Sequence, residues 1–309
     1  MRKIYRIHVI SYFCYMYYRR KILLALLEVF DNRLEKISLQ KLLMLVTKHQ
    51  EKPVFYFVPY KFGCFSFQAN ADLFTMTKYN QVKTEGSSWV KTDNIQYLKD
   101  LKEKDRQAIR NIKIKYGSKN ADELIKLTYI NFPYYAINST IANEKLSKDE
   151  YQKVVDSRPK YNKTTLFTIG YEGISLEEYL NKLLKHDIKV LCDVRKNSVS
   201  MKYGFSKSQL EKACEGVGIK YLHMPELGIE SDKRQLLNTQ LDYDNLFKGY
   251  RNDILPNTLN IQENLLAMLI EKKRIALTCF EANICRCHRK HLAEAIVDLP
   301  GFDYELKHI

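Results

Sequence analysis

The stretch TCFEANICRCHR, Thr278–Arg289, directly follows the apolar run Ile275–Leu277. A short apolar run of this kind predicts a buried β-strand. The reactive side chains then stand where the strand ends and the next helix begins. In open α/β folds, ligands bind at the carboxyl ends of the strands. The stretch therefore predicts an α/β fold with a functional site at this strand end.

Strands and helices alternate through the C-terminal half of the chain. A buried strand, Thr165–Ile169, runs into a loop with two glycines, Gly170 and Gly173, and then into a helix that Ser175 and Glu178 open as a capping box. Further strands are expected at 188–194, 221–224 and 274–280, with helices between them. This alternation predicts a mostly parallel sheet covered by helices, over residues 164–309.

The N-terminal half has a different pattern. An apolar stripe at helical spacing predicts a first helix from Ile22, and Ser38 is expected to cap a second. An aromatic, β-prone stretch turns at Gly63, and a third helix and a hairpin at 81–91 follow. We therefore expect a winged-helix-like α+β binding module over residues 16–130, including a basic helical extension, and a helical linker over 131–163. Core packing explains the aromatic stretch better than base stacking.

Charge and cysteine content indicate the class of protein. Lys and Arg number 50 against 36 Asp and Glu, a net charge of +14 that favours nucleic acid or nucleotide partners, although a solvated basic surface explains it equally well. Seven cysteines without spaced pairs indicate a reduced, cytoplasmic protein. No apolar stretch is long enough to cross a membrane. Residues 1–15 imitate a signal peptide without a cleavage site, so Met16 is the expected start.

Several C-terminal motifs together resemble a known family. They are TIGYEGISLEEYLNKL, VLCDVR, SMKYGFSKSQLEKACEGVGIKYLHMPELG and LTCFEANICRCHRKHLAEAI. In order and spacing they are similar to the family called "domain of unknown function 488", across residues 165–309. Lys196-Asn197 stand where that family usually has a proline. The resemblance implies an α/β fold with a polar site, and the family supplies no settled biochemical role.

The stretch SLQKLLMLVTKHQEKPVFYFVPYKFGCFSFQANADL, residues 38–73, resembles small domains related to the Panacea antitoxin domain. That resemblance implies a regulatory or binding module. It also suggests a setting such as mobile-element defence.

The candidate site residues stand at the strand ends of the C-terminal domain. Candidate catalytic residues are Glu281, Asp193 and Cys279. Candidate substrate-binding residues are Gly170, Tyr171, Gly173, Arg195, Ser198, Phe205, Lys207, His288 and Arg289. Carboxylates would act as general acid and base, while arginines and the glycine loop would hold an anionic group. Tyr171 or Phe205 would stack on a base.

Three other interpretations of Thr278–Arg289 compete with carboxylate chemistry. Zinc ligands are available at Cys279, Cys285, Cys287, His288 and His291. The stretch has no second paired cluster, however, and adjacent Cys287 and His288 rarely share one ion, so we expect no metal and no cofactor. Cys279 near Arg289 would be a nucleophile if its thiol were activated. In the third interpretation, Asp193–Arg195 and Glu281–Arg289 are buried ion pairs of a non-catalytic module.

We therefore expect an enzyme, a hydrolase or transferase, that acts on a nucleotide or nucleic acid through a carboxylate and arginine pocket. The alternative is a non-catalytic DNA- or ligand-binding regulator. Convergence of Asp193, Arg195, Glu281 and Arg289 on one open pocket would favour the enzyme. Separate buried pairs would favour the regulator.

Overall fold

The computed structural model describes residues 16–230, 232 and 237–309, and the chain divides into two compact units. Unit 1 is Met1–Phe55 with Gln68–Leu124, and unit 2 is Tyr56–Phe67 with Ile125–Ile309. Most of the aromatic stretch expected in the N-terminal module thus groups with the C-terminal residues. The signal-like segment before Met16 lies outside the described residues. Within them, no helix is both long and apolar enough to cross a bilayer.

Unit 1 combines helices with a small antiparallel sheet. Its strand order is β1-β5-β4, in which β4 and β5 form the predicted hairpin. The elements are α1 (Tyr18–Val29), β1 (Arg33–Glu35), α2 (Lys36–Thr47), α3 (Phe67–Lys78), β4 (Val82–Glu85), β5 (Ser88–Lys91), the short 3₁₀ turn η1 (Tyr97–Asp100) and α4 (Glu103–Tyr116). The helix α5 (Ala121–Asn131) contains the boundary with unit 2.

Ser38 is not the cap of the second helix. The chain passes from β1 straight into α2, and Glu35 is the N-cap residue, with extended backbone at φ −60° and ψ 144°. Ser38 lies buried within the first turn of the helix instead. The helix starts early because β1 holds the residues before Lys36 in an extended conformation, a constraint that the local cap signal does not reveal.

Unit 2 contains a five-stranded parallel sheet, so the predicted α/β fold is confirmed. The order is β10-β6-β9-β7-β8, and every neighbouring pair is parallel. The strands are β6 (Thr165–Gly170), β7 (Val190–Asp193), β8 (Lys220–His223), β9 (Arg274–Cys279) and β10 (Glu305–His308). The edge strand β10 is not anticipated from its sequence, ELKH, which is charged and largely exposed and therefore lacks the apolar signature of the others.

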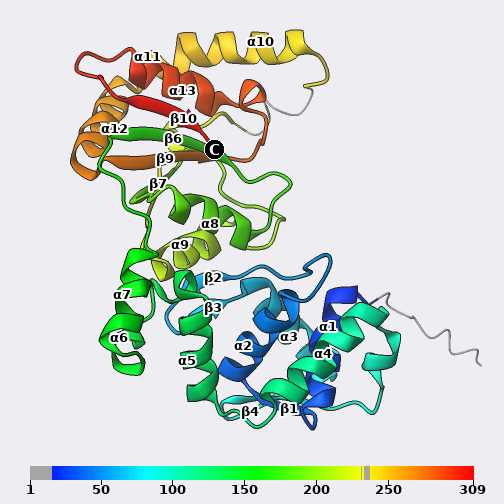
Figure 1. Ribbon diagram of the computed structural model, residues 1–309. Helices are drawn as coiled ribbons and strands as arrows, with labels where there is room; N and C mark the ends of the chain where they lie inside the picture. The colour runs from blue at the N-terminus through cyan, green and yellow to red at the C-terminus, as the bar shows by residue number, and fades with distance from the viewer. Residues whose placement is uncertain (1–15, 231, 233–236) are drawn as a thin grey trace, which may run out of the picture. The chain divides into compact units, whose positions relative to one another are not determined.

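Helices cover both faces of this sheet (Figure 1). On one face, α8 (Leu176–Lys185) and α9 (Lys207–Gly216) pack against Phe167, Leu191 and Ala276. On the other, α12 (Leu259–Lys272) and α13 (His288–Val297) pack against side chains that alternate with these along the strands, Leu166, Val190, Cys192, Ile275 and Leu277. Both faces are buried, which explains why these strands read as continuous apolar runs.

Shorter elements complete unit 2. The predicted capping box at the start of α8 is confirmed, since the Ser175 side chain accepts from the Glu178 amide and the Glu178 side chain accepts from the Ser175 amide. The hairpin of the aromatic stretch packs on α8, where Asn181 donates to the Phe57 carbonyl at 2.7 Å. The remaining elements are β2 (Val58–Tyr60), β3 (Gly63–Phe65), η2 (Pro133–Ala136), α6 (Ala142–Lys145), α7 (Lys148–Asp156), η3 (Pro225–Leu227), α10 (Gln240–Gly249), the π-turn η5 (Tyr250–Ile254), α11 (Leu255–Asn257) and η6 (Ile284–Arg286).

Candidate functional site

The strand order places a topological switch point beside β9. From β6 the chain crosses through α8 to β7, whereas from the neighbouring β9 it crosses through α13 in the opposite direction to β10. Adjacent strands whose connections diverge leave a crevice at their carboxyl ends. Gly170, the last residue of β6, pairs with Cys279, the last of β9, and Asp193 of β7 pairs with Thr278. The predicted strand-end residues therefore share one edge of the sheet.

Gly170 allows the loop after β9 to lie directly against β6. A Cβ at this position would lie 1.9 Å from the Glu281 carbonyl oxygen, so any larger residue displaces the loop. The amides of Tyr171 and Glu172 both donate to the Phe280 carbonyl, at 3.1 and 2.9 Å. Glu172 in turn accepts from the Ala282 amide. These amides of the glycine loop thus bind the neighbouring loop within the protein. Gly173, at φ +78°, faces open space.

Asp193 and Arg195 form a buried ion pair. Arg195 donates to both oxygens of the Asp193 carboxylate, and its other nitrogen donates to the Tyr171 hydroxyl at 2.6 Å and the Phe205 carbonyl at 2.9 Å. The Tyr221 hydroxyl donates to Asp193 at 2.7 Å, and burial and this carboxylate raise the pKa of Tyr221 well above its ordinary value. Burial opposes the charge of Arg195, yet the Asp193 carboxylate outweighs it and raises the pKa of Arg195. Both charges are therefore satisfied inside the protein.

The other predicted binding residues surround this pair. The rings of Tyr171 and Phe205 stack on each other, with centroids 4.2 Å apart and planes at 9°, and both are buried. Ser198 is buried and its carbonyl accepts from the amide of Lys207, which is exposed at the first turn of α9. Aromatic stacking between Tyr171 and Phe205 thus joins the loops after β6 and β7, and it engages the ring faces that a base would need.

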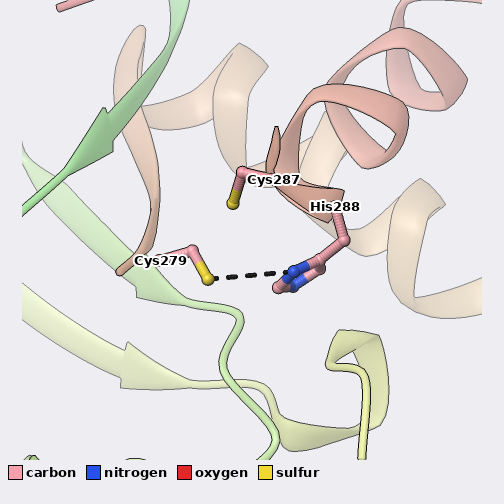
Figure 2. Close-up of side chains that lie close together, drawn as sticks. All are labelled: Cys279, Cys287 and His288. Atoms are coloured by element: carbon pink, nitrogen blue, oxygen red, sulfur yellow. Dashed lines mark hydrogen bonds between the residues drawn. The ribbon is translucent and has the colours of Figure 1, made fainter. Parts of the chain in front are cut away.

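A second cluster lies at the end of β9 (Figure 2). Cys279 and His288 are buried with Sγ and Nδ1 3.8 Å apart, and the Cys287 thiol points into the same space from the N-terminus of α13. The Glu281 carboxylate lies 3.3 Å from the Cys279 Sγ and is partly exposed. Burial and the Cys279 sulfur raise the pKa of Cys287 well above its ordinary value. Glu281 is therefore the member of this cluster with direct access to solvent.

Arg289 is buried beside the cluster without a carboxylate partner among the described residues. Its terminal nitrogens donate to the backbone carbonyls of Glu281 and Ala282, at 2.6 and 3.4 Å. In the part of the chain that the structure describes, its Nε has no hydrogen-bond partner, although this atom is shielded from solvent. Only 2% of the residue is exposed. A buried guanidinium with an unused donor is costly to the protein, which makes it a candidate binding group for an anion.

The four charged residues thus do not behave alike. Asp193 and Arg195 form an ion pair with each other, whereas Arg289 donates to the backbone carbonyl of Glu281. Cys285 is exposed, and His291 contacts Arg251 and Glu294.

Three residues of the site were not predicted from the sequence. They are Glu172, which accepts from the Ala282 amide, Tyr221, which donates to Asp193, and Lys202, which donates to the Tyr171 carbonyl. Tyr221 reaches Asp193 because it pairs with Leu191, which is two residues from Asp193 and therefore on the same face of β7; the sequence alone does not show this pairing.

Comparison with known families agrees with the C-terminal motifs. Residues 175–296 match the family model of DUF488, a domain of unknown function. The DUF488 match begins at the cap of α8 and ends within α13, so it contains β7, β8, β9 and the loop with Cys279 and Glu281. Gly170, Tyr171 and Gly173 precede it. No curated protein and no solved structure matches the chain. The resemblance of the N-terminal stretch to Panacea-related domains stays a prediction.

Proposed function

We propose that the DUF488-like unit is an enzyme, a hydrolase or transferase, that acts on a nucleotide or nucleic acid at the carboxyl end of β9. The observation that carries this proposal is the placement of a partly exposed carboxylate, Glu281, next to a buried arginine, Arg289, that has no carboxylate partner among the described residues. They stand at the switch point of a parallel sheet, where such folds bind their ligands.

Glu281 and Arg289 would divide the chemistry between them. A carboxylate with solvent access can remove a proton from a water or hydroxyl group. A guanidinium offers planar, forked donors that suit phosphate oxygens, and an anion accepting from the unused Nε would neutralise the buried charge. In this proposal the Asp193–Arg195 pair stabilises the loops after β6 and β7 and does not take part in the reaction.

Two substitutions test the enzyme directly. A panel of nucleotides and short oligonucleotides is incubated with the purified chain, and products are followed by chromatography. Glu281→Gln is expected to lower kcat by about 10²–10⁴-fold, as loss of a general acid–base group does. Arg289→Lys keeps the positive charge but removes the paired, planar N–H donors of the guanidinium. This substitution is expected mainly to raise KM for phosphorylated substrates.

The control is Arg286→Gln, which removes an exposed arginine of the same loop and is expected to leave both constants unchanged. Melting temperatures of all variants separate lost chemistry from lost folding. A well-folded wild-type protein that neither converts nor binds any member of the panel would contradict the proposal.

A second candidate function is nucleic-acid binding by unit 1. We propose that this unit is winged-helix-like, because helix, strand, helix, helix and hairpin follow one another and the first strand pairs with the second strand of the hairpin. The helix α4 exposes Arg110 and Lys115, which can contact phosphates. In this alternative the protein is a regulator without catalysis. The proposed setting, mobile-element defence, rests on the N-terminal resemblance alone.

Salt dependence tests the second candidate. Affinity for a labelled DNA duplex is expected to fall steeply with salt, and Arg110→Gln with Lys115→Gln should reduce the slope of log K against log[salt] by about 0.9 per lost phosphate contact. Lys148→Gln, an exposed substitution on α7, is the control and should leave the slope unchanged. A binding constant that does not respond to salt would exclude electrostatic DNA binding by unit 1.

A further inference from the structure

We propose that Cys279, Cys287 and His288 form a metal site for a thiophilic divalent cation, with zinc as the ion that fits best. Their ligand atoms all lie within 4.8 Å of one another, and the three residues are buried. Two thiolates and one imidazole are a donor set that zinc binds in proteins, and thiolates disfavour magnesium and calcium.

The distances suit a tetrahedral ion. Zinc–sulfur and zinc–nitrogen bonds of about 2.3 and 2.0 Å at a tetrahedral angle place sulfur and nitrogen about 3.5 Å apart. The Cys279 Sγ and the His288 Nδ1 are 3.8 Å apart. An ion between them therefore requires a shift of only a few tenths of an ångström, within the side-chain freedom of a cysteine and a histidine.

The histidine is already oriented as a ligand. Its Nε2 lies 2.9 Å from the Val194 carbonyl, which can only accept, so the ring proton is on Nε2. The Nδ1 lone pair consequently faces the sulfurs. Metal-binding histidines characteristically donate their second nitrogen to a carbonyl or carboxylate in this way, which fixes the tautomer and the plane of the ring.

Adjacent residues can both reach the ion because the backbone changes direction between them. Cys287 is extended, at φ −133° and ψ 133°, and His288 is the first residue of α13. In a continuous strand their side chains would point to opposite sides. At this junction both point toward Cys279 (Figure 2). The objection that neighbouring residues rarely share an ion therefore does not apply here.

Charge balance also favours an ion. Two buried thiolates are unfavourable without a counter-charge, and both cysteines are buried. A divalent cation would cancel both charges.

Glu281 lies beside these three ligands. Its carboxylate oxygen lies 3.3 Å from the Cys279 Sγ, so it would be near enough to accept a proton from a water molecule held by the ion. Three protein ligands and an open position are typical of catalytic zinc, which lowers the pKa of bound water. This catalytic use rests on the proposed function, whereas metal binding itself rests on the ligand geometry alone.

Metal analysis of the full chain tests the site. The protein is expressed with added zinc, purified without chelators and measured by mass spectrometry of its metal content. About one zinc per chain is expected. Replacement of the metal by Co²⁺ should produce the intense near-ultraviolet absorption of a thiolate–cobalt bond. Cys279→Ser and Cys287→Ser should each lose most of the zinc, while His288→Cys, which supplies another thiolate, should retain it with a changed cobalt spectrum.

The matched control is Cys285→Ser, in the same loop but exposed, which should keep zinc and spectrum unchanged. Absence of zinc from wild-type protein that also takes up no Co²⁺ would overturn the site, as would full retention of zinc by folded Cys279→Ser. A Cys279–Cys287 disulfide in protein purified under reducing conditions would also overturn the metal site. Bound zinc without nucleotide turnover would contradict only the proposed function.

Discussion

Replacement of Asp193 by alanine is expected to destabilise unit 2 by about 3–5 kcal/mol, the largest loss of stability that we expect from a single substitution at the site. The carboxylate is fully buried, and its removal leaves the Arg195 guanidinium without its counter-charge and the Tyr221 hydroxyl without its acceptor. The free energy of unfolding in urea, followed by circular dichroism, measures the effect.

Lys189→Ala is the control, because it breaks the ion pair with Asp187, in which the lysine is half exposed. Such a pair contributes about 0–1 kcal/mol. Equal, small effects of Asp193→Ala and Lys189→Ala would show that the buried pair does not brace the strand ends. Asp193 would then be available for the chemistry that sequence reasoning expected of it.

Gly170→Ala is expected to cost about 3 kcal/mol, the upper end of the range for overpacking. The added Cβ would lie 1.9 Å from the Glu281 carbonyl oxygen. This oxygen belongs to the backbone, so it cannot move away by rotating about a side-chain bond. The loop after β9 must move, which breaks the bond from Arg289 to that carbonyl. Urea denaturation measures the loss of stability, and the assay for nucleotide turnover measures the displacement of Glu281.

Gly173→Ala is the matched control in the same loop. It meets no atom within 4 Å and suffers only from its positive φ, a cost of about 1 kcal/mol. If Gly170→Ala and Gly173→Ala lower the free energy of unfolding equally, the close approach of Gly170 to the Glu281 carbonyl does not constrain the loop. Loss of turnover in Gly170→Ala alone is the result that links this contact to the proposed site.

Much of the fold of unit 2 can be predicted from local signals. Apolar runs such as Thr165–Ile169 give the strands, and Ser175 with Glu178 marks the start of α8. The exposed edge strand β10 lacks an apolar run, and Ser38 lies inside a helix whose start is set by β1. These two differences have one cause, because pairing with another strand determined the structure and the sequence pattern does not record pairing.

The candidate site was predictable in its location but not in its contacts. Sequence reasoning placed Gly170, Asp193 and Cys279 at strand ends, and the strand pairing brings them to one edge. It could not show that Arg195 turns back onto Asp193 or that Arg289 bonds to backbone. Such choices depend on side-chain directions and on loops that meet across the sheet. The adjacency of Cys287 and His288 likewise did not show that both side chains point toward Cys279, because that depends on a change of backbone direction between them.

The position of β9 has a consequence for how the unit assembles. It is the fourth strand of the sheet along the chain but lies between the first and the second, β6 and β7. Until it inserts, those two strands have no common neighbour, and each presents an unpaired edge of a kind that promotes aggregation. Pairing over such sequence distances is slow, because the intervening chain must close a long loop first. The strand that ends in Cys279 and leads into Glu281 is therefore also the one that joins β6 to β7, so the candidate site forms only after this long-range pairing is made.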